Sequence, residues 1–329
     1  MARALVLGAT GHIGAHIVRA LLAQGHQVRA AYRSERFLLV LEGLPVERVR
    51  VDVETLEGVR EALAGCEWVF HAAGYYPRLR GSRERAVERG VESTRRVIER
   101  LREARPSRIV FTSSLATIRR VPGRAATEDD AEPWPLDGTR SLYATVKIAM
   151  EHEMRVAVQA GLPVVIVNPS YCMGEYDARP FSGLLILLFA KHRLPWYLDH
   201  AFNVVYTGDV GIGHVRAAER GRLSERYLLS NRNVSLREFA RLVTQAAGLS
   251  APRWRLPYPV AVSAALASEA FAWAARTEPL LTRQALQTVR TPQIVDGTKA
   301  VRALGMPQTP IDEAIRRALA WFRQHGYLT

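Results

Sequence analysis

Two side chains on one predicted helix have the types and the spacing to move a proton. Tyr143 and Lys147 are four residues apart in the run Tyr-Ala-Thr-Val-Lys, so they share one helix face. An ammonium beside a phenol stabilises the phenolate and lowers the phenol pKa from about 10. Tyr143 could then act as a general acid or base on a carbonyl or alcohol oxygen. For the pair alone, an exposed helix pair is the simpler interpretation.

A serine upstream could bind the same substrate oxygen. Ser114 ends the run Phe111-Thr112-Ser113-Ser114, which closes a predicted strand. A doubly wound sheet presents its ligand-binding groups at the carboxyl ends of the strands. We therefore expect Ser114 to hydrogen-bond the oxygen on which Tyr143 acts. The alternative is a serine that only ends a turn.

A glycine-rich turn near the N-terminus has the features of a phosphate site. Gly8, Gly11 and Gly14 follow an apolar run, Ala4 to Leu7, and precede a helical pattern that starts at Ile13. A helix N-terminus offers unpaired N–H groups to a pyrophosphate. The glycines would allow a tight turn, close approach of phosphate and close packing of helix on strand. The spacing differs from the common G-x-G-x-x-G, and a tight loop without ligand is the alternative.

These groups need a parallel sheet to position them. Strands alternate with helices up to Pro169, which predicts an α/β fold with a doubly wound parallel sheet of Rossmann type. Residues Arg119 to Leu136 are expected to form a loop. The predicted strands are Ala4–Leu7, His26–Tyr32, Val46–Val51, Glu67–Phe70, Arg108–Thr112 and Val164–Asn168, and the helices after the first are Glu54–Leu63, Glu84–Ala104 and Ser141–Gln159.

After Pro169 helical patterns dominate. Ser235 and Glu238 form a capping box, and the last helix is expected to start with Thr309 as its N-cap and Pro310 in its first turn. The helices are Phe181–Lys191, Asp209–Arg220, Leu236–Ala247 and Ile311–His325, with short strands at Asn203–Tyr206 and Tyr227–Leu229. We assign residues 1–170, with a returning segment at 201–230, to nucleotide binding. Residues 171–200 and 231–329 form a smaller substrate lobe packed on it without a separable boundary.

Composition limits the kinds of partner that the protein can have. The 329 residues carry a formal charge of +13, mostly from arginine, which indicates a solvated basic surface or attraction to anionic ligands such as a phosphorylated cofactor. No nucleic-acid motif is present.

Cys66 and Cys172 in apolar surroundings favour a reducing, cytoplasmic location without disulfide or metal site. The first residues already form a core strand, so no signal peptide is expected. Pro257 to Ala275 predicts a packed or interface helix and no membrane span.

Taken in order, the motifs resemble the extended short-chain dehydrogenases/reductases of the NAD-dependent epimerase/dehydratase family. The glycine turn is followed by Asp52-Val53, His71-Ala72-Ala73, the Ser114 run and Tyr143-x-x-x-Lys147. Matches continue through Val165–Ser170 and Gly208–Val210, so that they cover nearly the whole chain. The sequence is most similar to the dihydroflavonol-reductase-like and hopanoid-associated sugar epimerase-like groups, the latter at Leu162–Ser170 and Pro252–Pro257.

The resemblance implies roles for individual residues. Tyr143 would be the general acid/base, Lys147 would bind the nicotinamide ribose and tune Tyr143, and Ser114 would orient the substrate oxygen. A homodimer would form through the helices at 84–104 and 141–159. The implied cofactor contacts are Gly8, Thr10, Gly11, His12, Ile13, Gly14, Asp52, Val53, Ala72, Ala73, Thr112, Ser113, Tyr143, Lys147, Asn168, Pro169 and Ser170.

One position departs from the family pattern. Related proteins carry an asparagine before Val91, in an N-V-x-G-T run, whereas this chain has Gly90 there and Ser93 in place of the glycine. If that asparagine holds a water chain near Lys147, another group must take over its function here.

The cofactor can be predicted from charge at the end of the second strand. No acid is available there to bind the ribose hydroxyls of NAD, and Arg33 follows Tyr32, with Arg36 close by. Arginine can bind a 2′-phosphate bidentately, which favours NADP(H), with NAD(H) as the alternative. Otherwise Arg33 would stack on adenine or point to solvent.

The leading prediction is an NADP(H)-dependent oxidoreductase that interconverts a ketone and a secondary alcohol. The alternatives are a nucleotide-sugar epimerase or dehydratase that regenerates its bound cofactor, and a non-catalytic NAD(P)-binding regulator. Arg179 and Arg216 could meet a diphosphate, and His12 is expected to face solvent or the phosphates. A partly apolar substrate is suggested by Tyr75, Tyr76, Tyr171, Met173, Phe181, Trp196, Tyr197 and Tyr206.

Overall fold

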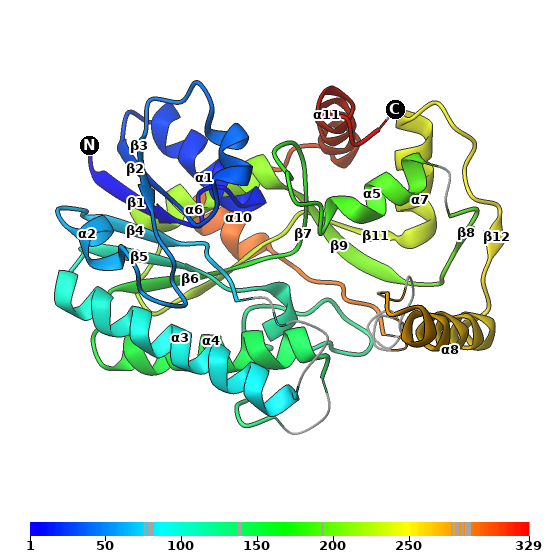
Figure 1. Ribbon diagram of the computed structural model, residues 1–329, viewed down its shortest axis with the longest axis horizontal. Coiled ribbons are helices and arrows are strands. Elements are labelled where there is room, and N and C mark those ends of the chain that lie inside the picture. Colours follow the sequence, from blue (N-terminus) through cyan, green and yellow to red (C-terminus); the bar gives the residue numbers. More distant parts are fainter. Residues whose placement is uncertain are drawn as a thin grey trace.

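A parallel seven-stranded sheet forms the centre of the molecule (Figure 1). The computed structural model describes every residue except 76, 78–81, 137–139, 192–193, 278, 280–282, 284–285, 287–290 and 329. The strand order is β10-β6-β5-β4-β1-β2-β3, which reverses between β1 and β4 as in a doubly wound fold. The predicted fold class is confirmed. The strands are β1 (Arg3–Leu7), β2 (Gln27–Tyr32), β3 (Glu47–Arg50), β4 (Trp68–His71), β5 (Arg108–Thr112), β6 (Val164–Pro169) and β10 (Arg226–Leu229).

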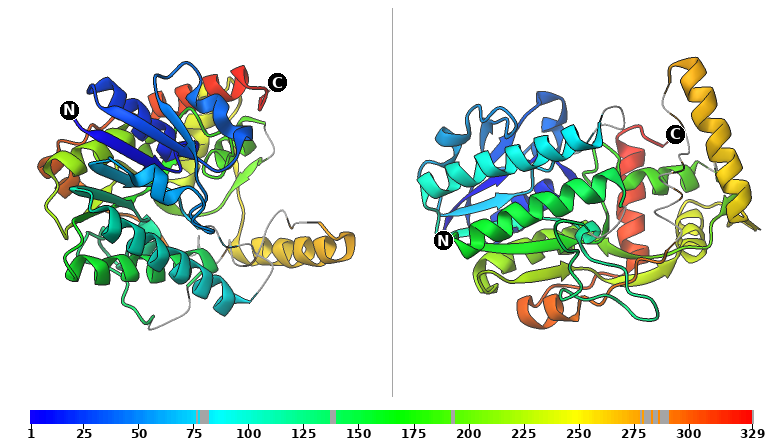
Figure 2. Two further views of the ribbon diagram at one scale, coloured as in Figure 1. Left: turned by 60° about the vertical axis from the view of Figure 1, so that its left-hand side comes forward. Right: turned by 90° about the horizontal axis from the view of Figure 1, so that it is seen from below.

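Helices cover both faces of this sheet (Figures 1 and 2). On one face lie α1 (His12–Ala23), α6 (Thr207–Arg220) and α10 (Thr298–Leu304), and on the other α3 (Arg83–Ala104) and α4 (Leu142–Gln159). Along β1, Ala4 and Val6 join the core with α1 and α6, while Leu5 and Leu7 join the core with α3 and α4. Because successive side chains face opposite sides, a strand covered on both faces must be apolar throughout.

The rest of the chain builds a smaller lobe beyond the carboxyl ends of these strands. Its three-stranded sheet has the order β11-β9-β7, and rings from β7, β9 and α7 meet in its core. The elements of this lobe are β7 (Tyr171–Met173), β9 (Ala201–Tyr206), β11 (Arg232–Ser235), α5 (Gly183–Ala190), α7 (Leu236–Ala246), α11 (Ile311–Gln324), the pair β8 (Trp196–Tyr197) with β12 (Trp254–Arg255), and α8 (Tyr258–Ala275).

The start of one helix lies five residues later than predicted. The helix expected from Glu54 begins only at α2 (Val59–Leu63), because Leu56 and Gly58 have φ of 66° and 72°, which a right-handed helix excludes. A short 3-10 helix at Glu35–Leu41 was not expected. Residues Leu115–Thr117, directly after Ser114, form another.

The last helix is not capped by Thr309. Pro310 occupies the N-cap position, and both polar groups of Thr309 bind the Asp209 carboxylate, the amide at 2.6 Å and the hydroxyl at 2.8 Å. Thr309 therefore ties α11 to the first turn of α6, a long-range contact that local sequence rules do not contain. The Ser235 cap of α7 is confirmed, since Ser235 Oγ accepts the Glu238 amide at 3.1 Å.

Gly90 lets α3 and α4 approach closely. A Cβ at this position would lie 2.9 Å from Val146 and 3.4 Å from Met150, both on α4. An asparagine here would require the Val146 side chain to shift. Ser93, the second departure, donates to the Val53 carbonyl at 3.3 Å and ties α3 to the loop after β3.

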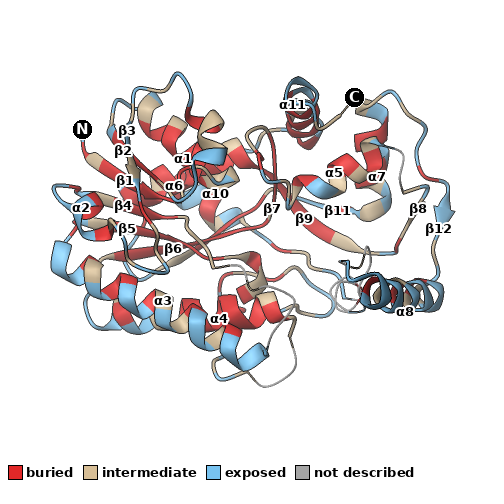
Figure 3. Cartoon of the chain, in the orientation of Figure 1, coloured by how far each residue is buried: buried red, intermediate tan, exposed pale blue. Residues whose placement is uncertain are grey.

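The helix predicted within Pro257–Ala275 is confirmed as α8, but it is not packed into the core. Only Ala261, Ala265 and Ala272 are buried, and most of its surface is exposed (Figure 3). No helix among the described residues is long and apolar enough to cross a membrane.

Candidate functional site

The glycine turn after β1 is packed against the end of β4. Gly8 has φ of 84°, and a Cβ there would lie 2.9 Å from the Ala73 nitrogen. A Cβ on Gly14 would lie 2.1 Å from the Gly8 carbonyl oxygen. Both positions therefore require glycine. Because β1 and β4 are neighbours at the point where the strand order reverses, the turn and Ala72-Ala73 line the crevice in which doubly wound folds bind nucleotides.

The first turn of α1 fits a pyrophosphate. Gly11 is its N-cap, with no side-chain cap and no acidic residue in the first turn. A Cβ on Gly11 would contact only the Gly8 carbonyl oxygen, at 3.2 Å, so the outer side of this turn is open. Thr10 and Ile13, which flank it, are half-buried. Free N–H groups and a positive helix end are what a bound phosphate needs.

His12 faces inward. Its side chain is 10% exposed, and Nδ1 lies 3.9 Å from the Asp177 carboxylate. Burial lowers its pKa. Of the two alternatives expected for His12, solvent or the phosphates, the first is therefore wrong, because the segment after β7 covers its side chain.

The three residues predicted to act on substrate come together at the carboxyl end of β5. The Tyr143 hydroxyl donates to Ser114 Oγ at 3.3 Å, and Lys147 Nζ lies 5.9 Å from the centre of the Tyr143 ring. Ser114 Oγ also accepts the Ala116 amide at 3.1 Å, which fixes its direction. Ser141 caps α4 through the Ala144 amide and so sets where the helix begins.

Lys147 is almost completely buried. Its exposed fraction is 4%, and desolvation lowers its pKa to about 8, against the opposing effect of Glu151 one turn further along α4. His71, at the end of β4, is 3% exposed. Burial and the charge of Lys147 lower the pKa of His71 to about 4, so this histidine is neutral at pH 7.

Sequence reasoning missed a buried carboxylate behind these residues. Glu151 is 3% exposed, and Arg226 of β10 binds its Oε1. Its Oε2 accepts from Ser113, from Thr117 at 2.7 Å and from Asn168 at 2.9 Å. One carboxylate thus joins α4 to the ends of β5 and β6 and to β10.

The spacing of Glu151 from Lys147 could have indicated that this carboxylate lies near the site. Glu151 follows Lys147 by four residues, so Tyr143, Lys147 and Glu151 lie along one face of α4. A glutamate on a helix is usually solvated, and only the position of Arg226, 75 residues later, shows that this one is buried and paired.

Several residues predicted to contact cofactor direct their polar groups into the protein. Thr112 Oγ1 lies 2.9 Å from His214 Nε2 on α6. Ser113 and Asn168 are bound to Glu151, and Asn168 is fully buried. Pro169 and Ser170 are buried beside them. The side chains of Thr112, Ser113 and Asn168 therefore shape the site from behind.

The residues expected around the adenine lie at the ends of β2 and β3. Arg33 follows β2, with a side chain 58% exposed and 2.9 Å from the Glu54 carboxylate. Asp52 Oδ1 accepts the Glu54 amide at 2.8 Å, which organises the turn containing Val53. Arg33 is thus held beside the loop after β3, with its guanidinium at the surface.

The residues proposed to line a substrate pocket differ in how far they are buried. Tyr171, Met173 and Tyr206 belong to the core of the smaller lobe, whereas Phe181 is 72% exposed. Tyr75, Trp196 and Tyr197 are half-buried, and Tyr76 lies outside the described residues. Of the two arginines, Arg179 is exposed and Arg216 donates to the Leu304 carbonyl at 3.4 Å.

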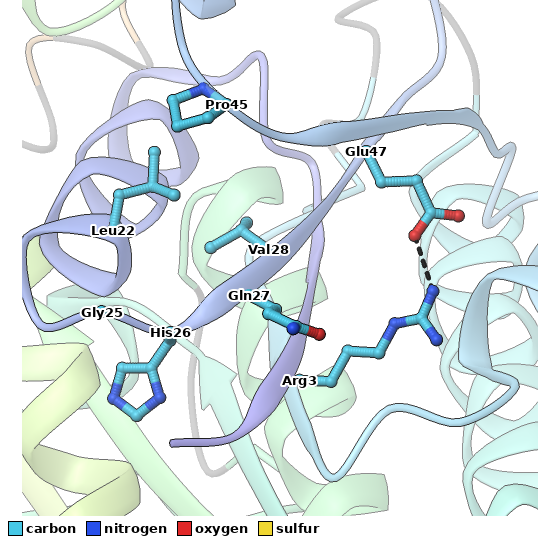
Figure 4. Close-up of a pocket in the computed structure, with 8 residues that line it drawn as sticks. All are labelled: Arg3, Leu22, Gly25, His26, Gln27, Val28, Pro45 and Glu47. Atoms are coloured by element: carbon cyan, nitrogen blue, oxygen red, sulfur yellow. Dashed lines mark hydrogen bonds and ion pairs between the residues drawn. The ribbon is translucent and has the colours of Figure 1, made fainter.

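A shallow cavity of about 370 Å³ lies at the other end of the sheet (Figure 4). It is lined by the first residues of β1, β2 and β3, with Arg3 paired to Glu47 at 2.8 Å. Doubly wound folds bind ligand at the opposite, carboxyl ends, so this cavity is not the predicted site. Among the described residues, no group of histidine, cysteine and acidic side chains could hold a metal ion.

The fold and the glycine turn together are those of the Rossmann class of dinucleotide-binding proteins. The chain belongs to the NAD dependent epimerase/dehydratase family, whose model matches residues 4–228. It is thus an NAD(P)-dependent oxidoreductase or epimerase of the short-chain dehydrogenase/reductase type, as the motifs predicted.

Individual relatives carry both reductase and epimerase names. A Synechocystis protein named as a dihydroflavonol 4-reductase is 32% identical over 98% of this chain and 95% of its own. Sterol demethylase protein B of Methylococcus capsulatus is 31% identical over 98% and 99%. The crystal structure of a nucleoside-diphosphate-sugar epimerase from Pseudomonas aeruginosa superimposes with a TM-score of 0.81, at 28% identity over 100% of this chain and 99% of that chain.

Replacing Glu151 by glutamine tests whether its charge holds the site together. Glu151→Gln leaves Arg226 buried without its counter-ion, and we expect a loss of about 3–5 kcal/mol in the free energy of unfolding. Glu153→Gln, two residues along the same helix, breaks only the surface pair with Arg95 and should cost less than about 1 kcal/mol. Urea unfolding of both variants measures the difference.

A double variant separates the charge from the packing. Adding Arg226→Met to Glu151→Gln removes the unpaired cation and should recover part of the loss. Equal destabilisation by Glu151→Gln and Glu153→Gln would show that the buried Glu151–Arg226 pair does not stabilise the fold more than a surface pair does.

Proposed function

We propose that this protein is an NADP(H)-dependent oxidoreductase that transfers hydride between the nicotinamide and a ketone or secondary alcohol. Tyr143 is the general acid/base, Ser114 binds the substrate oxygen, and Lys147 supports both Tyr143 and the cofactor ribose. The observation that carries this proposal is the 3.3 Å contact between Tyr143 and Ser114 beside the buried Lys147.

The geometry is suited to proton transfer at one oxygen atom. Two hydroxyls within hydrogen-bond distance of each other can both reach a single substrate oxygen that lies between them. During reduction Tyr143 donates its proton to that oxygen and becomes phenolate. The Lys147 ammonium stabilises this charge, more strongly because the site is buried. The bound nicotinamide supplies or accepts the hydride.

Support for an apolar substrate comes from the names of relatives. Two proteins that match along nearly their whole length are named for a dihydroflavonol and for a sterol, and both are polycyclic molecules. The half-buried Tyr75, Trp196 and Tyr197 lie in segments that could contact such a molecule. We propose a largely apolar carbonyl or alcohol as substrate.

A sugar epimerase is the second candidate. It is favoured by the close superposition on a nucleoside-diphosphate-sugar epimerase. The same tyrosine would then remove and return a proton in one catalytic cycle, and the cofactor would be regenerated. A non-catalytic regulator is not favoured, because nucleotide binding alone does not require a Tyr143–Ser114 contact next to a buried lysine.

Further parts of the proposal concern cofactor, assembly and location. Arg33 would bind the 2′-phosphate of NADP. The surfaces of α3 and α4 that point away from the sheet would pair with a second copy. Residues 1–170 and 201–230 would bind the nucleotide and the remainder the substrate. Both cysteines are buried free thiols, which suits a reducing, cytoplasmic location.

The first experiment identifies cofactor and reaction together. The purified protein is denatured and any released nucleotide is analysed. Native protein with NADPH is then offered apolar ketones, including flavonoid and sterol ketones, and nucleotide sugars. NADPH consumption with a ketone supports the reductase. Sugar isomers without net consumption indicate the epimerase, and failure to bind any nicotinamide nucleotide would contradict both.

Replacing Tyr143 by phenylalanine tests the acid/base directly. Tyr143→Phe removes the hydroxyl and keeps the ring, so we expect turnover to fall by about 10³-fold or more while the Kd for the cofactor stays nearly unchanged. Tyr327→Phe, which removes a hydroxyl that binds the Ala178 carbonyl near the C-terminus, is the control. Turnover that survives in Tyr143→Phe would exclude Tyr143 as the acid/base.

The pH dependence of reduction should report Lys147. Its pKa of about 8 means that the ammonium is lost above this pH, and the rate of carbonyl reduction should fall there. Lys147→Arg keeps a cation at higher pH, so the decline should move upward, at a lower overall rate. The exposed Lys191→Arg is the control and should leave the profile in place. A decline near pH 8 that persists in Lys147→Arg would rule out this assignment.

Cofactor preference should depend on Arg33. We expect wild-type protein to bind NADPH more tightly than NADH, and Arg33→Ser to weaken NADPH binding by roughly tenfold or more with little effect on NADH. Arg102→Ser removes an exposed arginine from the far end of α3 and controls for net charge. Equal Kd values for the two cofactors in the wild type would refute the preference.

A further inference from the structure

Exposed apolar side chains are concentrated on one segment of the molecule. Ten large hydrophobic residues are exposed among those described, and five of them lie between residues 254 and 273. We call these five the α8 surface: Trp254 (74% exposed), Val260 (52%), Leu266 (47%), Phe271 (72%) and Trp273 (85%). Concentrations of this kind mark contact sites for membranes or proteins.

The helix that carries this surface stands away from the body of the protein. Figure 2 shows α8 at the edge of the molecule in both views, projecting from the smaller lobe in the first. It is attached through Ala261 and Ala265, which pack with Leu198 and Leu286. Most of its remaining side chains are exposed (Figure 3), while Val262, Ser268 and Glu269 are half-buried.

The single charged side chain of α8 is paired. Glu269 is the single charged residue between Tyr258 and Ala275, and the Arg283 amide and guanidinium bind its two carboxylate oxygens at 2.8 Å. Contact with an apolar medium would therefore not strip water from an uncompensated charge.

The two ends of the surface combine indole rings with arginines. Trp254 lies next to the exposed Arg253 before the helix, and Trp273 lies three residues before the exposed Arg276 that ends it. Tryptophan favours the boundary between lipid and water, and arginine is attracted to anionic headgroups. The whole chain, at +13, has the opposite sign to such a surface.

We propose that the α8 surface docks the protein on an anionic lipid bilayer, with the helix lying in the interface and not crossing it. Its apolar side chains enter the headgroup boundary, while Arg253 and Arg276 contact the phosphates. An anionic surface attracts a chain that carries +13, and a second copy, which carries the same charge, offers α8 no such attraction. Docking does not depend on the enzymatic reaction.

Sedimentation with vesicles tests the proposal. The full chain is mixed with vesicles of phosphatidylcholine alone or with added phosphatidylglycerol. We expect binding to the anionic vesicles that weakens with salt. The double variant Phe271→Ser/Trp273→Ser should lose at least about tenfold in partitioning. Leu184→Ser/Leu223→Ser removes two equally apolar side chains elsewhere, 50% and 47% exposed, and should bind like the wild type.

Two outcomes of the vesicle experiment would contradict the proposal. No binding of the wild type to either vesicle overturns it, and so does undiminished binding by Phe271→Ser/Trp273→Ser. Light scattering on the same samples compares the mass of the wild type with that of the variant. A lower mass for Phe271→Ser/Trp273→Ser would show that α8 contacts a second copy. Circular dichroism verifies that the variants fold, as expected for residues so exposed.

Discussion

The buried carboxylate of Glu151 is the constraint on which the rest of the site depends. A charge in the interior is tolerated only when its partners are fixed around it. Here they come from the ends of β5 and β6, from β10 and from the 3-10 turn after Ser114. Since Glu151 belongs to α4, the same contacts fix the helix that carries Tyr143 and Lys147. The residues proposed to move the proton are therefore held in place by a neighbour whose two carboxylate oxygens both bind protein groups.

The strand order places the two halves of the site next to each other. Parallel strands end at the same edge of a sheet, so the glycine turn after β1, the alanines after β4 and Ser114 after β5 are neighbours. Contact between these turns is so close that Gly8 has no room for a side chain. Similarly, Gly90 allows α3 to lie against α4. Membership of the epimerase/dehydratase family agrees with this arrangement.

Two tyrosines of the smaller lobe belong to its core. Tyr171 and Tyr206 fill its core and bind the Ser182 carbonyl and Glu175, so they are not available to a substrate. Apolar side chains that remain at the surface are gathered on α8 instead. If the substrate is a lipid-like ketone, a bilayer is where such a molecule dissolves, and a chain docked there would meet it at high local concentration.

The sequence alone determined the parallel sheet, the glycine turn and the Tyr143-x-x-x-Lys147 helix, because these depend on local period and on spacing within single elements. Tertiary structure decided everything that depends on distant partners. Glu151 is buried because Arg226 pairs with it. Thr309 does not cap α11 because it binds Asp209. His12 is covered by the segment after β7. Such contacts join positions about 75 to 165 residues apart, and a pattern read along the chain does not contain them.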